Sequence, residues 1–152
     1  MCEVSFAKQG AIDYNGFIEY ARYVENYYGT PRAFVEKEMA NGSNVLLEIE
    51  VQGAQNIKRQ YPDAVLLFIS PPSAKILRDR LVHRGTETME VIEKRMSRAA
   101  EEADSMAQYD YIVVNDDLET CIDEVHGIIC AEAKKACHNQ EFIDNMKEQL
   151  TK

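Results

Sequence analysis

Three short apolar runs, separated by helical patterns, organise most of the chain. They cover residues 44–50, 64–70 and 111–115, and polar residues interrupt them only near their ends. Nearly continuous apolar runs of this length are typical of parallel strands that are covered on both faces. We therefore expect three parallel strands in one sheet.

Apolar residues recur every three or four positions in the intervening segments, which predicts amphipathic helices. Pro31 suits the first turn of one such helix and Gly42 its end, while Asp116 and Glu119 have capping-box spacing. The expected helices cover 31–41, 54–60, 73–82, 88–106, a segment that starts at Asp116, and 141–150. The helix after Asp116 has an apolar stripe that we expect to be buried, formed by Leu118, Cys121, Ile122, Val125 and Ile129. Alternation of strands and helices predicts an α/β fold, a mostly parallel sheet flanked by helices.

Composition and charge narrow the class of protein. The 152 residues suit one domain with a sizeable core, and the formal net charge of -9 opposes binding to nucleic acid or to an anionic membrane. The four cysteines show no CxxC spacing, and we find neither a membrane-spanning apolar run nor a leader pattern. These features predict a cytoplasmic protein with reduced thiols.

Arginine is concentrated in one part of this acidic chain. Arg78, Arg80 and Arg84 fall within seven residues, and Arg95 and Arg98 lie on the next helical segment. Guanidinium groups match phosphate oxygens, so the cluster indicates a small, highly charged anion as ligand. The alternative is a solvated helical face with intrahelical ion pairs.

Two carboxylates stand at the end of the first apolar run. Glu48 and Glu50 alternate with Leu47 and Ile49, so both carboxylates should face the same side of an extended segment. Ligand sites in parallel sheets gather at the carboxyl ends of strands. The pair is therefore suited to magnesium, usually through its water shell, or to a hydrogen-bonding substrate. A strand end that simply emerges into solvent is the alternative.

A second candidate constellation comprises Glu19, Tyr28 and Thr30. The carboxylate of Glu19 could accept two parallel N–H bonds, as guanine presents them at N1 and its exocyclic amine. Tyr28 offers a hydroxyl for a phosphate, and Thr30 a hydroxyl for a base carbonyl. Structural alternatives are a surface charge at Glu19, a tyrosine that braces the turn at Gly29, and a helix cap at Thr30.

These segments together resemble the central and C-terminal part of guanylate kinases. The supporting segments are FIEYA (17–21), NYYGT (26–30), LLEIEVQGAQ (46–55), FISPPS (68–73), RLVHRGTET (80–88), IEKRM (92–96) and YDYIVVNDD (109–117). Their order and spacing match the family from about Phe17 to about Lys135. The resemblance implies phosphorylation of GMP to GDP by ATP with Mg²⁺, and a P-loop NTPase-like parallel sheet flanked by helices.

Residue roles follow from the resemblance only where positions match. It implies that Glu19 and Thr30 contact the guanine base and that Tyr28 contacts the GMP phosphate. It also implies that Glu48 contacts GMP and that Glu50 lies near magnesium, at a position where the family more often has Asp. It also implies catalytic arginines in and beside the lid (Arg80, Arg84 and Arg95) and an adenine neighbour (Asn115). Residues 1–33 would be a remnant of the GMP-binding subdomain, and residues 34–152 the α/β core with a lid at about 78–98.

The sequence also departs from the family pattern. It has no GxxxxGK[ST] motif, and the only basic residue before Glu19 is Lys8, so the arginine pair that binds the GMP phosphate is missing. We expect an N-terminally incomplete fold, self-association through exposed sheet surface, and little kinase activity of this chain alone, since the loop amides and lysine hold the ATP phosphates. Alternatives are a non-catalytic guanylate-kinase-like module that binds a phosphorylated partner, and an unrelated α/β domain.

Overall fold

The computed structural model describes residues 5–6, 16–23 and 26–151, with the backbone alone for 5–6, 21–23 and 26–28. The chain divides between Leu66 and Leu67 into two compact units, here called the N-terminal unit and the C-terminal unit. This division falls later in the chain than the expected subdomain boundary between residues 33 and 34. Each unit is described by itself.

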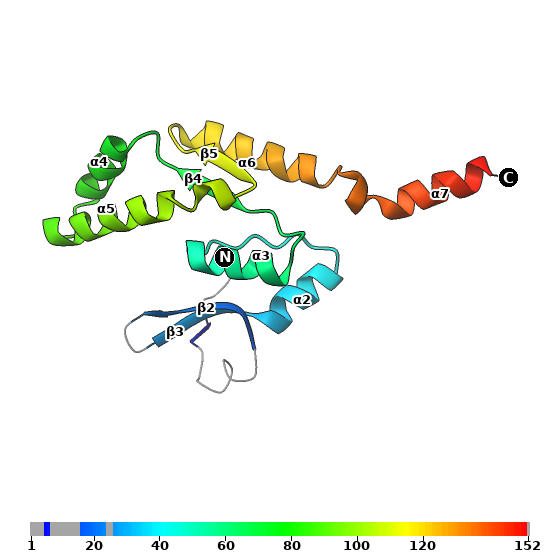
Figure 1. Ribbon diagram of the computed structural model, residues 1–152, viewed down its shortest axis with the longest axis horizontal. Coiled ribbons are helices and arrows are strands. Elements are labelled where there is room, and N and C mark those ends of the chain that lie inside the picture. Colours follow the sequence, from blue (N-terminus) through cyan, green and yellow to red (C-terminus); the bar gives the residue numbers. More distant parts are fainter. Residues whose placement is uncertain (1–4, 7–15, 24–25, 152) are drawn as a thin grey trace. The chain divides into compact units, whose positions relative to one another are not determined.

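The N-terminal unit contains an antiparallel sheet and two helices (Figure 1). The strand order is β1 (Ser5–Phe6), β3 (Asn26–Pro31), β2 (Phe17–Tyr23), and the helices are α2 (Arg32–Ala40) and α3 (Val51–Gln60). The sequence analysis predicted none of these three strands. The signal was present, because phenylalanine, isoleucine and tyrosine favour strands and are dense between residues 17 and 28.

A β-bulge interrupts the pairing of β2 with β3. Phe17 lies opposite Pro31 and Glu19 opposite Thr30, so Ile18 is the extra residue of β2. A bulge of this kind redirects the side chains that follow it. Gly29 permits the close approach of the two strands beyond the bulge, since a Cβ atom there would lie 2.6 Å from the carbonyl oxygen of Glu19.

The core of the N-terminal unit is formed by Ile18, Val35 and Ile57, against which partly buried side chains pack, namely Val45, Leu47, Ile49, Tyr61 and Ala64. The strand predicted over 44–50 is not formed. The segment pairs with no described strand, and alternate side chains hold it on the core instead. The opposite side of the segment, with Glu48 and Glu50, is exposed.

The C-terminal unit contains a parallel two-stranded sheet, as predicted for two of the three apolar runs. Its strands are β4 (Leu67–Ser70) and β5 (Tyr111–Val114), and its helices are α4 (Ala74–Arg84), α5 (Met89–Ala103), α6 (Leu118–Glu132) and α7 (Gln140–Leu150) (Figure 1). The chain is thus a mixed α/β protein. No helix among the described residues has the length and apolar character needed to cross a membrane.

Side-chain caps define where these helices begin. Ser73 accepts a hydrogen bond from the amide of Ile76, and Thr88 one from the amide of Val91. The cap predicted at Asp116 is wrong by one residue, because Asp117 accepts from the amide of Thr120 at 2.9 Å. A left-handed glycine, Gly85 with φ of 63°, ends α4 and begins the loop to α5.

The buried stripe predicted for α6 is largely exposed. Only Cys121 is buried, while Leu118 is 60% exposed and Ile122 50%. The physical reason is the width of the sheet, since two strands of four residues offer too little surface to cover a fifteen-residue helix. Ile112 and Val114 of β5 are also exposed, so the expectation of strands covered on both faces is not met. Self-association through this apolar surface stays a prediction.

Candidate functional site

Glu19 and Thr30 are brought together across the hairpin of the N-terminal unit. The hydroxyl of Thr30 donates a hydrogen bond to Glu19 Oε1 at 2.9 Å, because the bulge places the two residues opposite each other. The single hydroxyl proton of Thr30 is thereby committed to Glu19, and its oxygen offers only lone pairs to a ligand. Donation from Thr30 to a base carbonyl, as the sequence suggested, would require this bond to break.

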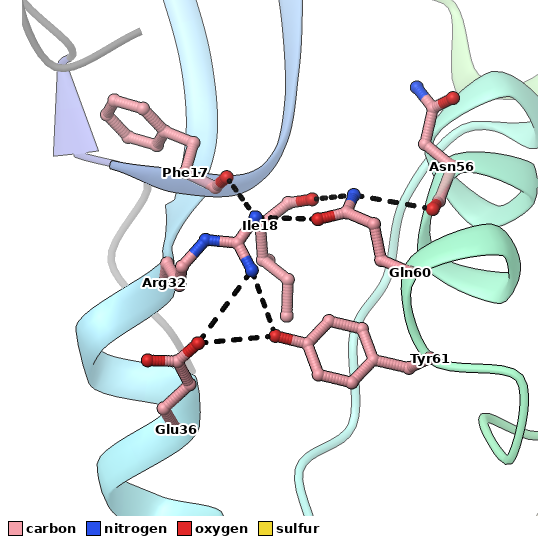
Figure 2. A network of polar contacts seen from close by, with 7 residues as sticks. All are labelled: Phe17, Ile18, Arg32, Glu36, Asn56, Gln60 and Tyr61. Atoms are coloured by element: carbon pink, nitrogen blue, oxygen red, sulfur yellow. Dashed lines mark hydrogen bonds and ion pairs between the residues drawn. The ribbon is translucent and has the colours of Figure 1, made fainter. Parts of the chain in front are cut away.

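Two carbonyl groups at the bulge bond to side chains instead of to a neighbouring strand. Pro31, opposite Phe17, has no N–H to donate to the ladder. Arg32 Nη2 donates to the carbonyl of Phe17 at 3.2 Å, and Gln60 Nε2 donates to the carbonyl of Ile18 at 3.0 Å (Figure 2). These are the two residues that immediately precede Glu19, so the backbone that carries the carboxylate is fixed.

Arg32 and Gln60 also bond to each other, and we call this pair the Arg32–Gln60 clamp. Arg32 Nη2 donates to Gln60 Oε1 at 2.6 Å and Arg32 Nη1 to the hydroxyl of Tyr61 at 3.0 Å, with Glu36 3.8 Å away (Figure 2). The side chain of Arg32 is only 20% exposed. The sequence analysis missed this clamp, because its partners lie 28 residues apart in the chain. The only local signal was a long cationic side chain directly after Pro31.

The first turn of α3 approaches the carboxylate of Glu19. Gly53 is buried there, and a Cβ atom added to it would lie 3.2 Å from Glu19 Oε2. The two carboxylate oxygens of Glu19 therefore have different surroundings. Oε1 is bonded to Thr30, and Oε2 lies beside a helix residue that has no side chain.

The other candidate residues of the N-terminal unit, Glu48, Glu50 and Tyr28, have fewer described contacts than Glu19 and Thr30. Glu48 and Glu50 share the exposed side of the 43–50 segment, and Glu50 is the N-cap residue of α3 with extended backbone. Tyr28 pairs with Ala21 through the backbone, but its side chain lies outside the described residues. Within the described ranges no three histidine, cysteine or acidic side chains gather as a metal site would need.

Two candidates of the C-terminal unit are in direct contact. Arg80 on α4 donates to the carbonyl oxygen of Asn115 at 2.6 Å and to that of Asp116 at 3.1 Å. The structure thus joins Arg80, an arginine of the expected lid, to the residue expected beside adenine, through the backbone of the loop that follows β5. Arg80 Nη1 and Nη2 thus each donate to a carbonyl oxygen of the chain itself.

The other arginines of the cluster differ in their partners. Arg95 forms an ion pair with Glu87 at 2.5 Å, and Glu87 Oε2 is buried with no hydrogen-bond partner among the described residues. Arg78 forms a two-point pair with Glu93 at 2.5 and 2.9 Å, and this guanidinium lowers the pKa of Glu93. Arg84 makes no hydrogen bond or ion pair within the described part of the chain. Arg78 and Arg95 are thus engaged in ion pairs with carboxylates of the protein, as the alternative interpretation of the arginine cluster proposed.

Comparison with known proteins gives one family. A guanylate kinase family model matches residues 6–132. The guanylate kinase of Shouchella clausii is 46% identical over 86% of this chain and 62% of its own length. That of Listeria monocytogenes serovar 1/2a is 45% identical over 92% of this chain and 67% of its own length. A crystal structure of guanylate kinase from Anaplasma phagocytophilum superposes with a TM-score of 0.70 and 32% identity, over 85% of this chain and 62% of that chain. The chain thus spans 62–67% of the length of these relatives. It belongs to the guanylate kinase family.

Proposed function

We propose that this chain takes part in the transfer of the γ-phosphate of ATP to GMP, and that its N-terminal unit binds the guanine base. The observation that supports this most directly is the Glu19–Thr30 hydrogen bond at 2.9 Å. It orients a carboxylate that still has free lone pairs on both oxygens. Guanine presents two adjacent donors, the N1–H and the exocyclic amine, and a fixed carboxylate is complementary to them.

This arrangement predicts selectivity between purines. Adenine has an acceptor at N1, which would face the Glu19 carboxylate with no proton between them. A buried acceptor left without a donor costs about 1–3 kcal/mol, which corresponds to roughly tenfold to a hundredfold in affinity. GMP should therefore bind more tightly than AMP.

The C-terminal unit would supply the contacts to ATP. Transfer of a phosphoryl group depends mainly on positioning and on positive charge around the oxygens, so arginines are the expected groups. Arg84 is the candidate for a direct phosphate contact, because its guanidinium makes no hydrogen bond or ion pair with any described residue. Arg95 would have to exchange Glu87 for phosphate. Arg80 would hold the adenine loop through the carbonyl of Asn115.

Carboxylates of the 43–50 segment fit a magnesium ion that arrives with ATP. Glu48 and Glu50 are hard oxygen donors on one exposed side, which suits Mg²⁺. Two such groups are fewer than a complete protein site needs, so the ion would keep waters and phosphate oxygens. The bound ion would neutralise phosphate charge. We further propose that Tyr28 contacts the GMP phosphate, that Glu48 contacts GMP, and that the two strands of the C-terminal unit belong to a P-loop NTPase-like sheet.

The proposal is tested by calorimetric titration of GMP and AMP into the 152-residue chain. We expect GMP to bind at least about tenfold more tightly than AMP, and Glu19→Gln to remove most of that difference. Glu124→Gln, an exposed carboxylate on α6, is the matched control and should leave both affinities unchanged. Equal affinities for the two nucleotides, or unchanged GMP binding in Glu19→Gln, would refute the base-binding role.

A further inference from the structure

The contact between Gly53 and Glu19 assigns a role to a residue that carries no side chain. A methyl group on Gly53 would lie 3.2 Å from Glu19 Oε2 and 3.5 Å from Cβ and Cδ1 of Ile49. The distances to Ile49 are ordinary van der Waals separations, whereas the distance to Glu19 is tighter than such contacts usually are. Any side chain at position 53 therefore acts first on the carboxylate.

The side chain of Glu19 is the part of the contact that can move most easily. Its backbone is fixed from behind, since the carbonyls of Phe17 and Ile18 are bonded to the Arg32–Gln60 clamp. A displaced carboxylate would have to rotate about its own side-chain bonds. That rotation weakens the bond from Thr30 at 2.9 Å or turns Oε2 away from its present direction.

Glycine at this position is unfavourable for the helix itself. Gly53 is the third residue of α3, and alanine is a better helix former than glycine. Its backbone also needs no left-handed conformation, because the positive φ values of the described glycines belong to Gly42 and Gly85. The space beside Glu19 is the remaining physical reason for glycine here.

We infer that Gly53 is a specificity-determining positioning residue: by leaving room for Glu19 Oε2, it lets both carboxylate oxygens face the two donors of guanine. The inference rests on the proposed base-binding role of Glu19. It adds that the selectivity for guanine depends on α3 as well as on the hairpin. Gly53 acts through Glu19 and touches no phosphate.

The first test is Gly53→Ala, titrated with GMP, IMP and AMP. IMP keeps the N1–H but lacks the exocyclic amine, so it reports on one of the two donors. We expect GMP affinity to fall by about fivefold to tenfold, IMP affinity to fall less, and AMP affinity to stay the same. The thermal midpoint should not fall, since alanine favours the helix. Unchanged GMP affinity in a folded Gly53→Ala variant overturns the inference.

Gly127→Ala is the matched control. Gly127 is also a helical glycine, and a Cβ atom there meets no atom within 4 Å. This variant should keep the GMP, IMP and AMP affinities of the parent chain. A loss of GMP affinity equal to that of Gly53→Ala would mean that the effect is not specific to the Glu19 contact and would refute the inference.

A double-mutant cycle with Glu19→Asp identifies the contact itself. Aspartate withdraws the carboxylate by one methylene, so Gly53→Ala should cost much less GMP affinity in that background than in the parent chain. Additive losses overturn the inference. If Gly53→Ala alone fails to fold, folding of the double variant supports the contact, and misfolding of both refutes it. If Glu19→Asp and Glu19→Gln leave GMP binding unchanged, the proposed base-binding role fails instead.

Discussion

Arg80 holds the backbone of Asn115, with 2.6 Å between its Nη1 and the carbonyl oxygen of that residue. A second bond, to the carbonyl of Asp116, makes this a two-point attachment of α4 to the loop that follows β5. The loop leads directly into α6, whose first turn is capped by Asp117. One arginine therefore connects the proposed lid region, residues 78–98, to the loop that we propose to lie beside adenine.

Removal of this attachment should loosen the loop. In Arg80→Met we expect amide hydrogen exchange of residues 115–117 to accelerate by about threefold to tenfold, as the loss of two exposed hydrogen bonds worth roughly 1 kcal/mol together predicts. Mass spectrometry of the exchanged protein measures this. Arg84→Met is the control: Arg84 lies on the same helix but bonds to no described residue, so its removal should leave exchange of the loop unchanged. Equal exchange in the parent and Arg80→Met would show that the loop is held by other contacts.

The Arg32–Gln60 clamp should contribute measurably to the stability of the chain. Arg32→Met removes the donor from the part-buried carbonyl of Phe17 and from the exposed side-chain oxygen of Gln60, and the part-buried acceptor left without a donor should cost about 1 kcal/mol. Urea denaturation followed by circular dichroism gives the change in unfolding free energy. Arg59→Met is the comparison, because the bonds of exposed Arg59 to described residues stay within α3, to Gln55 and Asn56. A loss in Arg59→Met as large as that in Arg32→Met would contradict the role of the clamp.

Gly29 should tolerate no side chain. A Cβ atom there would lie 2.6 Å from the backbone oxygen of Glu19 and 2.8 Å from a ring carbon of Phe17, so the two strands would have to separate. Overpacking of this kind costs about 1–3 kcal/mol or more, and we expect Gly29→Ala to lose that amount in chemical denaturation. Gly127→Ala, in open space on α6, should instead gain up to about 1 kcal/mol. Similar stability of the two variants would argue against close packing of β2 on β3.

The Arg78–Glu93 pair predicts that the contact of α4 with α5 depends on pH. Arg78 lowers the pKa of Glu93 by its hydrogen bond and its charge, so folding favours the ionised carboxylate. The contribution is fully present above the unfolded-state pKa of glutamate, about 4.3, and is lost as the pH falls through the lower folded value. After correction for the intrinsic pH dependence of amide exchange, the protection of α4 and α5 should be greater near pH 7 than near pH 3, and Glu93→Gln should abolish much of that difference. Glu101→Gln, on the same helix, should preserve it.

The sequence predicted elements best where the pattern depended on local chemistry. The helices expected from Ser73 and from Thr88 begin one residue later, at Ala74 and Met89, and the parallel pairing of β4 with β5 followed from their continuous apolar runs. The apolar run over 44–50 misled the prediction, because alternate side chains can pack on a core without strand pairing. Apolar content specifies burial, whereas a strand also needs a neighbour for its backbone hydrogen bonds.

The candidate site could be predicted as a set of residues but not as a geometry. The sequence analysis named Glu19 and Thr30 as candidates. Their mutual hydrogen bond depends on the bulge at Ile18, which no local sequence motif predicts. The donors that replace the lost ladder bonds, Arg32 and Gln60, come from two different helices. Gly53 was missed as well, because a residue without a side chain shows its role only through what it lies beside.

The two units should respond differently to ionic strength. The bonds of the Arg32–Gln60 clamp run mostly to neutral oxygens, those of Phe17, Gln60 and Tyr61, and its arginine is largely shielded from solvent. The ion pairs of the lid region, Arg78–Glu93 and Arg95–Glu87, have exposed guanidinium groups that dissolved ions screen. A rise in salt would therefore loosen the helices that carry the arginines proposed to bind phosphate, while the proposed guanine site around Glu19 keeps its shape. Anions such as phosphate would add to this effect by competing with Glu87 for Arg95.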